Sequence, residues 1–259
     1  MSAVAIIPAR YASTRFPGKP LVSLAGKPII RHVYERVSKA ERIEGVFVAT
    51  DSEAIRTAVE DFGGRAILTA SSHQSGTDRI AEALQKLEGE GRTAHVVINV
   101  QGDEPLIEPA MVDHVAALMD DTRASMATLA KKISDVLEIT DPNVVKVTFD
   151  KEGFALYFSR APVPYHRDVF GQGMSGLAPS ALHKVRMFKH IGIYAYRRDE
   201  LLRFAALKPT WLEESERLEQ LRALEHGFRI KVGETLCDTM GVDTPGDLER
   251  VKRCLNISS

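Results

Sequence analysis

The sequence predicts an α/β fold built on a doubly wound, mostly parallel sheet, and two observations carry this prediction. Short apolar runs rich in β-forming residues alternate with stretches in which apolar residues recur at helical spacing, which is the rhythm of βαβ units. The run from Val96 to Val100 is continuously apolar, as expected of a central parallel strand covered on both faces. In such Rossmann-like sheets, ligands bind beyond the carboxyl ends of the strands, so the loops at that edge indicate the function.

The first half of the chain supplies the alternating elements. Ile30, Val33, Tyr34 and Val37 lie at helical spacing, and Ile80, Ala83, Leu84 and Leu87 repeat the pattern. We therefore expect helices over these two stretches and a third helix from about Glu53. The strands that alternate with them are expected over residues 4–7, 46–49, 66–68 and 96–100.

The rhythm changes from about Val144. Strands are expected over residues 145–149, 154–158 and 188–196, separated by a stretch from Gly171 to Pro179 that is rich in Gly, Pro and Ser and is expected to be disordered. We interpret residues 150–200, approximately, as an inserted β-rich segment within a single domain that spans residues 1–259. A helix is expected over residues 213–225, and a last helix begins with Thr244 as N-cap and Pro245 in the first position.

Composition excludes several classes of function. The 34 basic and 35 acidic side chains leave a formal charge of −1, so no global field attracts the protein to nucleic acid. The apolar runs are far shorter than the roughly 20 residues that span a bilayer, and the N-terminus has no signal-peptide pattern, so a cytoplasmic protein without membrane insertion is expected. Cys237 and Cys254 lack partners at zinc spacing and are interpreted as reduced packing residues.

Three cations follow the first predicted strand. Arg10, Arg15 and Lys19 lie in one loop at the carboxyl end of that strand, and Gly18 permits the backbone to approach a ligand closely. This concentration of charge suggests a triphosphate. The sequence contains neither the dinucleotide glycines nor a Walker motif, because Gly18-Lys19 is followed by proline. A solvated basic loop is the structural alternative.

Two further loops carry polar groups toward the same edge. Ser75 precedes a helix with Asp78 three residues later, which is the spacing of a helix cap, although amides at a helix N-terminus also bind polar ligands. Asp103 follows the central strand directly. A lone loop carboxylate is usually just solvated, but beside a triphosphate it would repel the ligand unless a cation such as Mg²⁺ lay between them.

Several strings along the chain resemble sugar nucleotidyltransferases. The string over residues 10–21 is similar to the signature of that superfamily and, in this form, to that of the CMP-Kdo synthetases, where Kdo is 3-deoxy-manno-octulosonate. The further strings that resemble the same family occur in the family's order at residues 73–79, 99–105, 157–164, 189–196, 218–222 and 241–248. Val163 is a mild departure, standing where the family has Ile. The resemblance implies a nucleotidyltransferase fold of the GT-A type.

The resemblance also implies roles for the nucleotide-binding residues. Arg10 and Lys19 would contact the triphosphate of CTP, with Arg15 as a further candidate. The residues expected to border the base, the ribose or the nucleotide are Ser75, Gly76, Arg79 and Gln101. Asp103 and Asp243 would hold one or two Mg²⁺ ions, and catalysis would come from Arg10, Lys19 and these two aspartates. Asp243 is expected at the end of a strand and just before the last helix. The structural alternative is that its carboxylate only stabilises the N-terminal dipole of that helix.

The second half of the chain offers candidates for the acceptor site. Arg160 suits a sugar carboxylate because guanidinium binds it bidentately. His190 and Tyr194 alternate onto one face of a predicted strand, although such a pair is more often sheet surface. Glu216 and Gln220 share a helical stripe with Glu213, for which a solvated face is the alternative. The resemblance assigns Arg160, His190, Tyr194, Glu216 and Gln220 to the sugar.

The reaction implied by the resemblance is attack of the anomeric hydroxyl of Kdo on the α-phosphate of CTP, within a homodimer. An 8-amino relative of Kdo or a sialic acid is the nearest alternative acceptor, since both share the carboxylate. A glycosyltransferase is disfavoured because the chain has no Asp-x-Asp motif. A nucleotide-binding regulator without turnover would need no acceptor pocket, and the sequence offers candidates for one.

Overall fold

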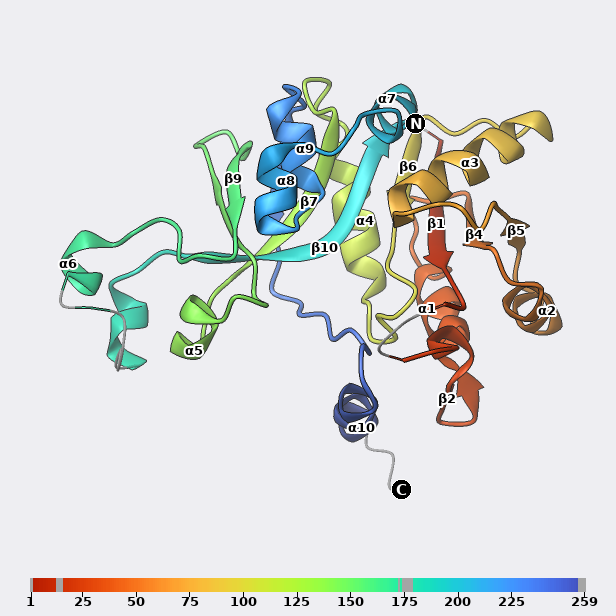
Figure 1. Cartoon of the computed structure of the whole chain (residues 1–259), viewed down its shortest axis with the longest axis horizontal. Coiled ribbons are helices and arrows are strands. Elements are labelled where there is room, and N and C mark those ends of the chain that lie inside the picture. The colour runs from red at the N-terminus through yellow and green to blue at the C-terminus, as the bar shows by residue number, and fades with distance from the viewer. Residues whose placement is uncertain (1, 13–15, 172, 174–178, 256–259) are drawn as a thin grey trace.

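A largely parallel sheet organises the chain, and the computed structural model describes residues 2–12, 16–171, 173 and 179–255 of it (Figure 1). Seven strands form the main path of the sheet in the order β11-β7-β10-β6-β1-β4-β5, and β8 and β9 extend it as a hairpin beside β10. The strands are β1 (Ala3–Ala9), β4 (Gly45–Thr50), β5 (Ala66–Leu68), β6 (Val96–Asn99), β7 (Met126–Lys132), β8 (Lys146–Phe149), β9 (Ala155–Ser159), β10 (Phe188–Arg197) and β11 (Ile230–Glu234); β2 (Ser23–Leu24) and β3 (Lys27–Pro28) form a separate small hairpin.

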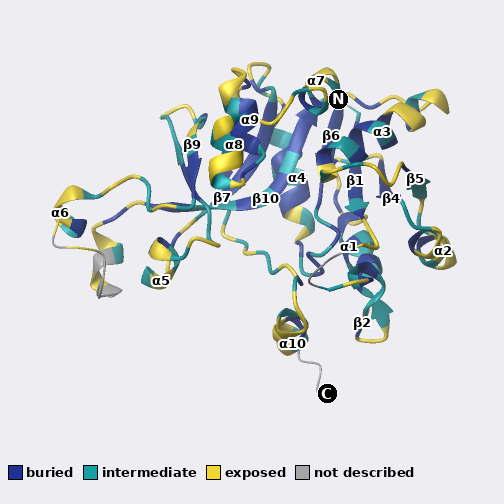
Figure 2. Cartoon of the chain, viewed as in Figure 1, coloured by how far each residue is buried: buried dark blue, intermediate teal, exposed yellow. Residues whose placement is uncertain are grey.

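Helices cover both faces of this sheet. They are α1 (Ile29–Val37), α2 (Glu53–Asp61), α3 (Gly76–Gly89), α4 (Pro109–Leu118), α5 (Val136–Thr140), α6 (Arg167–Phe170), α7 (Arg198–Ala205), α8 (Trp211–Glu216), α9 (Gln220–Glu225) and α10 (Pro245–Cys254), with 3-10 helices η1 (Lys19–Leu21) and η2 (Pro179–His183). Alternate residues of β1 enter different cores: Ala5 and Ile7 pack with α1, α2 and α4, whereas Val4 and Ile6 pack with α3, α7 and α9. The sheet is therefore buried between two helical layers, as Figure 2 shows by the dark strands.

The predicted doubly wound, mostly parallel sheet is confirmed. β1 pairs in parallel with β4 and β6, β4 pairs in parallel with β5, and β7 pairs in parallel with β11. On the main path of the sheet β10 is the exception, because it runs antiparallel to both β6 and β7. β7 and β11 were not predicted from the sequence: β7 is an apolar run that ends in two lysines, and β11 is a five-residue strand with a lysine inside it.

An arm extends from one end of the sheet. We use this name for the described residues between 136 and 187, which contain α5, the β8–β9 hairpin, α6 and η2, and which lie to the left in Figure 1. The arm has a small core of its own that includes Ile139, Phe170 and Met187. β10 begins beside the arm and continues into the centre of the main sheet, so the expected β-rich segment over about 150–200 shares a strand with the rest of the fold. Most of the stretch expected to be disordered, 171–179, lies outside the described residues.

The helix expected over residues 213–225 is broken into α8 and α9. Arg217 between them has φ 54°, a left-handed conformation that ends α8. The Nε of Arg160 donates to the Glu216 carbonyl at 2.7 Å and its Nη2 donates to the Arg217 carbonyl at 3.4 Å, which satisfies the carbonyl groups that the break exposes. The prediction that Glu213, Glu216 and Gln220 lie on one face of a single helix is therefore wrong.

Asp243 was also expected at the end of a strand, and this was wrong. β11 ends at Glu234, and residues 235–244 form an extended connection without a strand, which we call the strap. The predicted start of the last helix is confirmed, because Thr244 and Asp247 form a reciprocal capping box at α10. Within the residues placed by the structure, no helix is long and apolar enough to cross a membrane.

The break at Arg217 leads to a stability prediction. A residue with a Cβ pays a steric cost of about 1 kcal/mol in the left-handed region, and glycine does not. Arg217→Gly should therefore raise the free energy of unfolding by about 1 kcal/mol, measured by urea denaturation. Arg217→Ala is the matched control, because it removes the same exposed side chain and keeps the Cβ. Equal stability of the Gly and Ala variants would contradict this interpretation of the break.

Candidate active site

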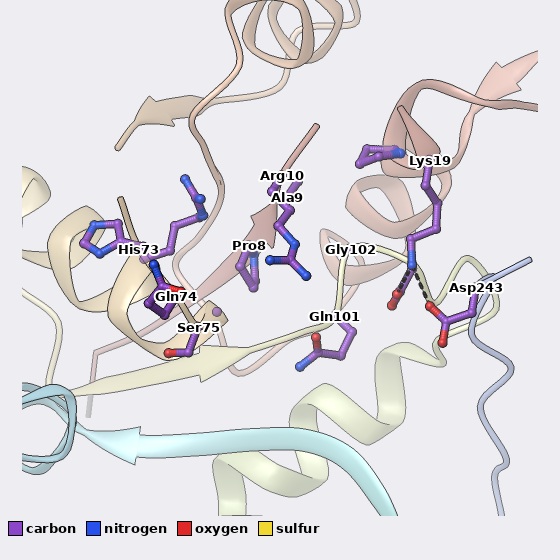
Figure 3. Close-up of a pocket in the computed structure, with 14 residues that line it drawn as sticks. Pro8, Ala9, Arg10, Lys19, His73, Gln74, Ser75, Gln101, Gly102 and Asp243 are labelled. Carbon is purple, nitrogen blue, oxygen red and sulfur yellow. Dashed lines mark hydrogen bonds and ion pairs between the residues drawn. The ribbon is translucent and has the colours of Figure 1, made fainter. Parts of the chain in front are cut away.

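A polar pocket of about 280 Å³ lies at the carboxyl ends of β1 and β6 (Figure 3). These strands are parallel neighbours, with Ile6 opposite Asn99, so the loops that follow them meet at one edge of the sheet. The pocket is lined by residues 8–10, 19–20, 73–76 and 101–103 together with Arg79 and Asp243. Eight of the nine predicted nucleotide, catalytic and metal residues thus line one cavity, and Arg15, the ninth, lies outside the described residues.

The ammonium group of Lys19 joins two carboxylates in this pocket. Its Nζ lies 2.5 Å from Oδ2 of Asp103 and 2.9 Å from Oδ1 of Asp243. Burial lowers the pKa of Lys19, but the charges and hydrogen bonds of Asp103 and Asp243 outweigh it, so the pKa lies above its usual value. Gly18, with φ 68°, makes the left-handed turn that starts η1 and brings Lys19 to this position.

The strap brings Asp243 to Asp103 from the far end of the chain. The amide of Val242 donates to the carbonyl of Asp103 at 2.9 Å, which joins the two backbones beside their carboxylates. Asp247 accepts from the amide of Asp243 at 3.0 Å, so the cap of α10 also holds the strap. Nearer the start of the strap, Asp238 accepts from Lys131 at 3.1 Å and from Lys189 at 2.8 Å. The position of Asp243 is thus determined by contacts on both sides of it.

The two carboxylates fit a divalent metal ion. Both reach the same ammonium group, so their oxygen atoms converge on one cation position, and carboxylate oxygens are the ligands that Mg²⁺ prefers. Within the described ranges, no group of three His, Cys, Asp or Glu side chains gathers to hold a metal. Two aspartates with water and phosphate oxygens match the way Mg²⁺ is held at phosphate-transfer sites.

The loop before α3 forms the opposite wall of the pocket. Ser75 and Asp78 form the predicted capping box, in which Oγ of Ser75 accepts from the amide of Asp78 at 3.1 Å. Gly76 lies against Pro8, where an added Cβ would stand 3.4 Å from the proline ring. Ser75 and Gly76 therefore serve the helix cap and also face the cavity.

Arg79 is placed differently from the other cations of the pocket. Its guanidinium is buried and donates to Oγ1 of Thr69 at 2.6 Å and to Oδ2 of Asp51 at 3.0 Å. Arg79 thus ties the loop over residues 69–76 to the end of β4. Arg10, by contrast, is exposed at the mouth of the pocket.

The sequence analysis did not assign three groups that border this site. His73 and Gln74 line the cavity, and His73 forms a short hydrogen bond with Glu82 of α3. Glu104, next to Asp103, is buried, and this burial with the nearby charge of Asp103 raises the pKa of Glu104 to about 8. His73 belonged to one of the strings that carried the resemblance, but no pattern in the sequence indicated the burial of Glu104.

The predicted sugar residues form a second group beside the cavity. Glu216 accepts from Oγ of Ser159 at 2.6 Å and from the amide of Arg160 at 2.9 Å. Nη1 of Arg160 donates to the carbonyl of Pro142 at 2.8 Å, so the guanidinium spans the break between α8 and α9 and the loop before β8. The first contacts of Arg160 are thus backbone carbonyls, and its binding to a sugar carboxylate stays a prediction.

His190 and Tyr194 lie on one face of β10, as predicted. Their ring centroids are 5.3 Å apart, and the ring of His190 also packs edge-on against Phe158 at 5.1 Å. Burial lowers the pKa of His190 to about 3 and raises that of Tyr194, so both side chains are neutral at physiological pH. Gln220, at the start of α9, is buried.

Two hydrogen bonds connect the surroundings of the predicted sugar-binding residues to the nucleotide pocket. Nε2 of Gln101 donates to the carbonyl of Gly192 at 3.4 Å, which joins the pocket floor to β10. Oγ1 of Thr77, in the first turn of α3, donates to Glu219 at 2.6 Å, beside Gln220. The two groups of predicted residues therefore adjoin one another. The contact between Thr77 and Glu219 was not indicated by the sequence, because 142 residues separate its partners.

An α/β sheet with a basic and acidic pocket at its carboxyl edge fits a nucleotide-binding enzyme of the nucleotidyltransferase class. The family model described as cytidylyltransferase matches residues 4–231. A 3-deoxy-manno-octulosonate cytidylyltransferase of Thermodesulfovibrio yellowstonii is 53% identical over 100% of both chains, and that of Geotalea uraniireducens is 52% identical over 97% of this chain and 98% of its own. The chain belongs to the 3-deoxy-manno-octulosonate cytidylyltransferase family.

One solved structure agrees with this assignment, and a second shows the shared fold. A CMP:2-keto-3-deoxy-manno-octonic acid synthetase in complex with CTP superposes with a TM-score of 0.88 at 42% identity, over 99% of each chain. A 4-diphosphocytidyl-2C-methyl-D-erythritol synthase from Anaerococcus prevotii matches with a TM-score of 0.61 at 13% identity, over 98% of this chain and 96% of its own, and so shares the fold.

Glu82 gives a pH-dependent prediction for the wall of the pocket. Burial raises its pKa, but hydrogen bonds from Lys86, the amide of Ala70 and His73 lower it to about 2, against 4.5 for the unperturbed group. Because the folded state lowers this pKa, the contribution to stability is present above pH 4.5 and is lost as the pH falls toward 2. Glu82→Gln should therefore reduce the free energy of unfolding by about 1 kcal/mol at neutral pH, since the carboxylate is partly exposed and screened.

The measurement is urea denaturation of both proteins from pH 7 to pH 3, and the difference in stability should shrink below pH 4.5. Glu90→Gln, at the exposed end of the same helix, is the control and should change stability little at any pH. A stability difference for Glu82→Gln that is independent of pH would show that the carboxylate charge is not responsible.

Proposed function

We propose that this chain transfers CMP from CTP to the anomeric hydroxyl of Kdo, releases pyrophosphate and thereby forms CMP-Kdo for lipopolysaccharide synthesis. The observation that carries the proposal is the convergence of Asp103 and Asp243 on the ammonium group of Lys19 within the pocket. A relative of known structure that is 42% identical is described in complex with CTP, which supports CTP as the donor. The names of the closely similar relatives support Kdo as the acceptor.

In the proposed reaction, the anomeric oxygen of the sugar forms a bond to the α-phosphorus while the bond from that phosphorus to the pyrophosphate oxygen breaks. The hydroxyl proton leaves to solvent. Arg10 and Lys19 face the cavity and are the chain's own cations for the triphosphate and for the charge that develops on pyrophosphate. Ser75, Gly76 and Gln101 form the polar wall for the nucleoside, and Arg79 holds that wall against Asp51.

We further propose Mg²⁺ as the cofactor, with Asp103 and Asp243 as its ligands. The ion, when bound, would neutralise the α-phosphate and lower the pKa of the attacking hydroxyl. The raised pKa of Lys19 keeps its ammonium charged, so in the absence of ligands the two carboxylates already have a cation between them. Asp238 and Asp247 hold the strap, which keeps Asp243 within reach of Asp103.

The acceptor residues are proposed to be Arg160, His190, Tyr194, Glu216 and Gln220. Ser159 and the amide of Arg160 orient the carboxylate of Glu216, which suits it to accept from sugar hydroxyls. The hydrogen bond between Gln101 and Gly192 places β10 beside the nucleotide pocket, as the in-line approach of a sugar to the α-phosphate requires. We propose the cytoplasm, where CTP is made, as the site of the reaction.

The test is pyrophosphate release with each of the four nucleoside triphosphates and a panel of Kdo, 8-amino-Kdo and a sialic acid. We expect release with CTP and Kdo. Asp103→Ala and Asp243→Ala should each lower the rate roughly 100-fold or more, because each removes a ligand of the Mg²⁺ ion that is proposed to neutralise the transferring phosphate. Asp61→Ala, an exposed aspartate on α2, is the control and should keep full activity.

Faster release with another acid sugar would replace Kdo as the acceptor. Binding of CTP without release of pyrophosphate would support the regulator without turnover. Full activity of both aspartate variants would refute the metal assignment, and circular dichroism of each variant separates loss of function from loss of fold.

We propose that the protein is a homodimer that pairs through the arm. Three large apolar side chains of the arm, Leu137, Leu156 and Tyr165, are 73%, 63% and 59% exposed, and we propose that the partner subunit covers them. Light scattering should give twice the chain mass of 28.6 kDa. Leu156→Asp should shift the protein toward the monomer, whereas Leu236→Asp, on the exposed strap, should not. A wild-type mass of one chain would refute the proposal.

A further inference from the structure

A buried threonine lies opposite an irregularity in β10. The pairing of β10 with β7 shifts register between Ile191 and Tyr194. Thr128 of β7 faces this interruption and is fully buried. Its Oγ1 lies 2.8 Å from the carbonyl oxygen of Ile193, 3.1 Å from that of Ile191 and 2.9 Å from Nε2 of His190. One hydroxyl thus meets two backbone carbonyls and a histidine ring.

The protons at this cluster can be assigned from its chemistry. A carbonyl oxygen only accepts, and the threonine hydroxyl has a single proton to donate. If that proton pointed to His190, Oγ1 would face two carbonyl oxygens at 2.8 and 3.1 Å with no hydrogen between them, which is repulsive in a buried site. The hydroxyl therefore donates to a carbonyl, and Nε2 of His190 donates its hydrogen to Oγ1.

We propose that Thr128 is a positioning residue that holds His190 in the tautomer protonated at Nε2, so that Nδ1 accepts a hydrogen bond from a hydroxyl of the sugar acid. This inference rests on the proposed function, in which His190 belongs to the acceptor site. It assigns a role to a residue that lies behind the histidine and that the sequence strings did not indicate.

The surroundings of the ring support this assignment. Among the residues that the structure describes, Nδ1 of His190 has no hydrogen-bond partner, and the side chain is only half-buried. Phe158 and Tyr194 pack against the ring and restrict its rotation. Because the pKa of His190 is lowered to about 3, the ring stays neutral at physiological pH, and the hydrogen bond to Thr128 decides which nitrogen has the proton.

The experiment compares Thr128→Val, which replaces the hydroxyl by a methyl group of similar size, with Thr128→Ser, which keeps the hydroxyl. Long-range ¹H–¹⁵N spectra of the histidine rings, assigned with His190→Gln, report the tautomer in the protein without ligands. We expect the protonated nitrogen to be Nε2 in the wild type and in Thr128→Ser, and mainly Nδ1 in Thr128→Val, because Nε2 then loses its acceptor.

Steady-state kinetics gives the second measurement. Thr128→Val should raise KM for Kdo roughly 10-fold, the effect expected from the loss of one hydrogen bond to the sugar, and should change KM for CTP less than about 2-fold. Thr128→Ser should restore KM for Kdo. The unchanged KM for CTP shows that the variant is folded.

Two results would overturn the inference: a proton on Nδ1 in the wild type, or a Thr128→Ser variant that is as impaired for Kdo as Thr128→Val. If the wild type is inactive with Kdo but Thr128→Val still moves the ring proton from Nε2 to Nδ1, the proposed function is refuted and the role of Thr128 in fixing the tautomer is supported. The spectra and the kinetics therefore distinguish the two failures.

Discussion

The site depends on one electrostatic constraint, which is that two carboxylates from distant parts of the chain meet at the same point. Asp103 and Asp243 would repel each other in a half-buried pocket without a cation between them, and the ammonium group of Lys19 occupies that position. The constraint explains why η1, the loop after β6 and the strap come together where they do. It also accounts for the raised pKa of Lys19, which keeps the cation charged. In the proposed function, this pocket would exchange its internal cation contacts for a metal ion and a triphosphate.

The nucleotide and sugar halves of the site are joined by contacts that bind no ligand in the proposed mechanism. Thr77 holds Glu219 beside α9, and Lys189 of β10 holds Asp238 of the strap. β10 contributes to both halves, since Gly192 accepts from Gln101 while His190 and Tyr194 belong to the proposed acceptor group. Its antiparallel course in an otherwise largely parallel sheet makes this possible, because β10 starts beside the arm, beyond the carboxyl end of β6, and runs back into the sheet. The register shift in β10 is stabilised by Thr128.

Local patterns predicted the frame of the molecule well. The continuous apolar run of β6, the helical spacing in α1 and α3, and the capping box at Thr244 each depend on neighbours in the chain, and the structure confirms them. The interpretations that failed depend on distant partners. The break at Arg217 is stabilised by Arg160 of β9's carboxyl end, and the strap is extended because Lys131, Lys189 and the Asp103 backbone hold it. The spacing of apolar residues along the chain does not reveal contacts between residues that are distant in sequence.

The sequence by itself therefore determined the doubly wound sheet, the edge at which ligands bind and, through its resemblance to a known family, the identity of most pocket residues. Only the tertiary structure shows that Lys19 bridges the two aspartates. It also shows that Arg79 and Arg160 form hydrogen bonds with other groups of the protein, and that Thr128 contacts Nε2 of His190. The reason is physical: strands and helices form from interactions within a few residues, whereas the charge state, the tautomer and the available donors of a site are set by groups that only folding brings together.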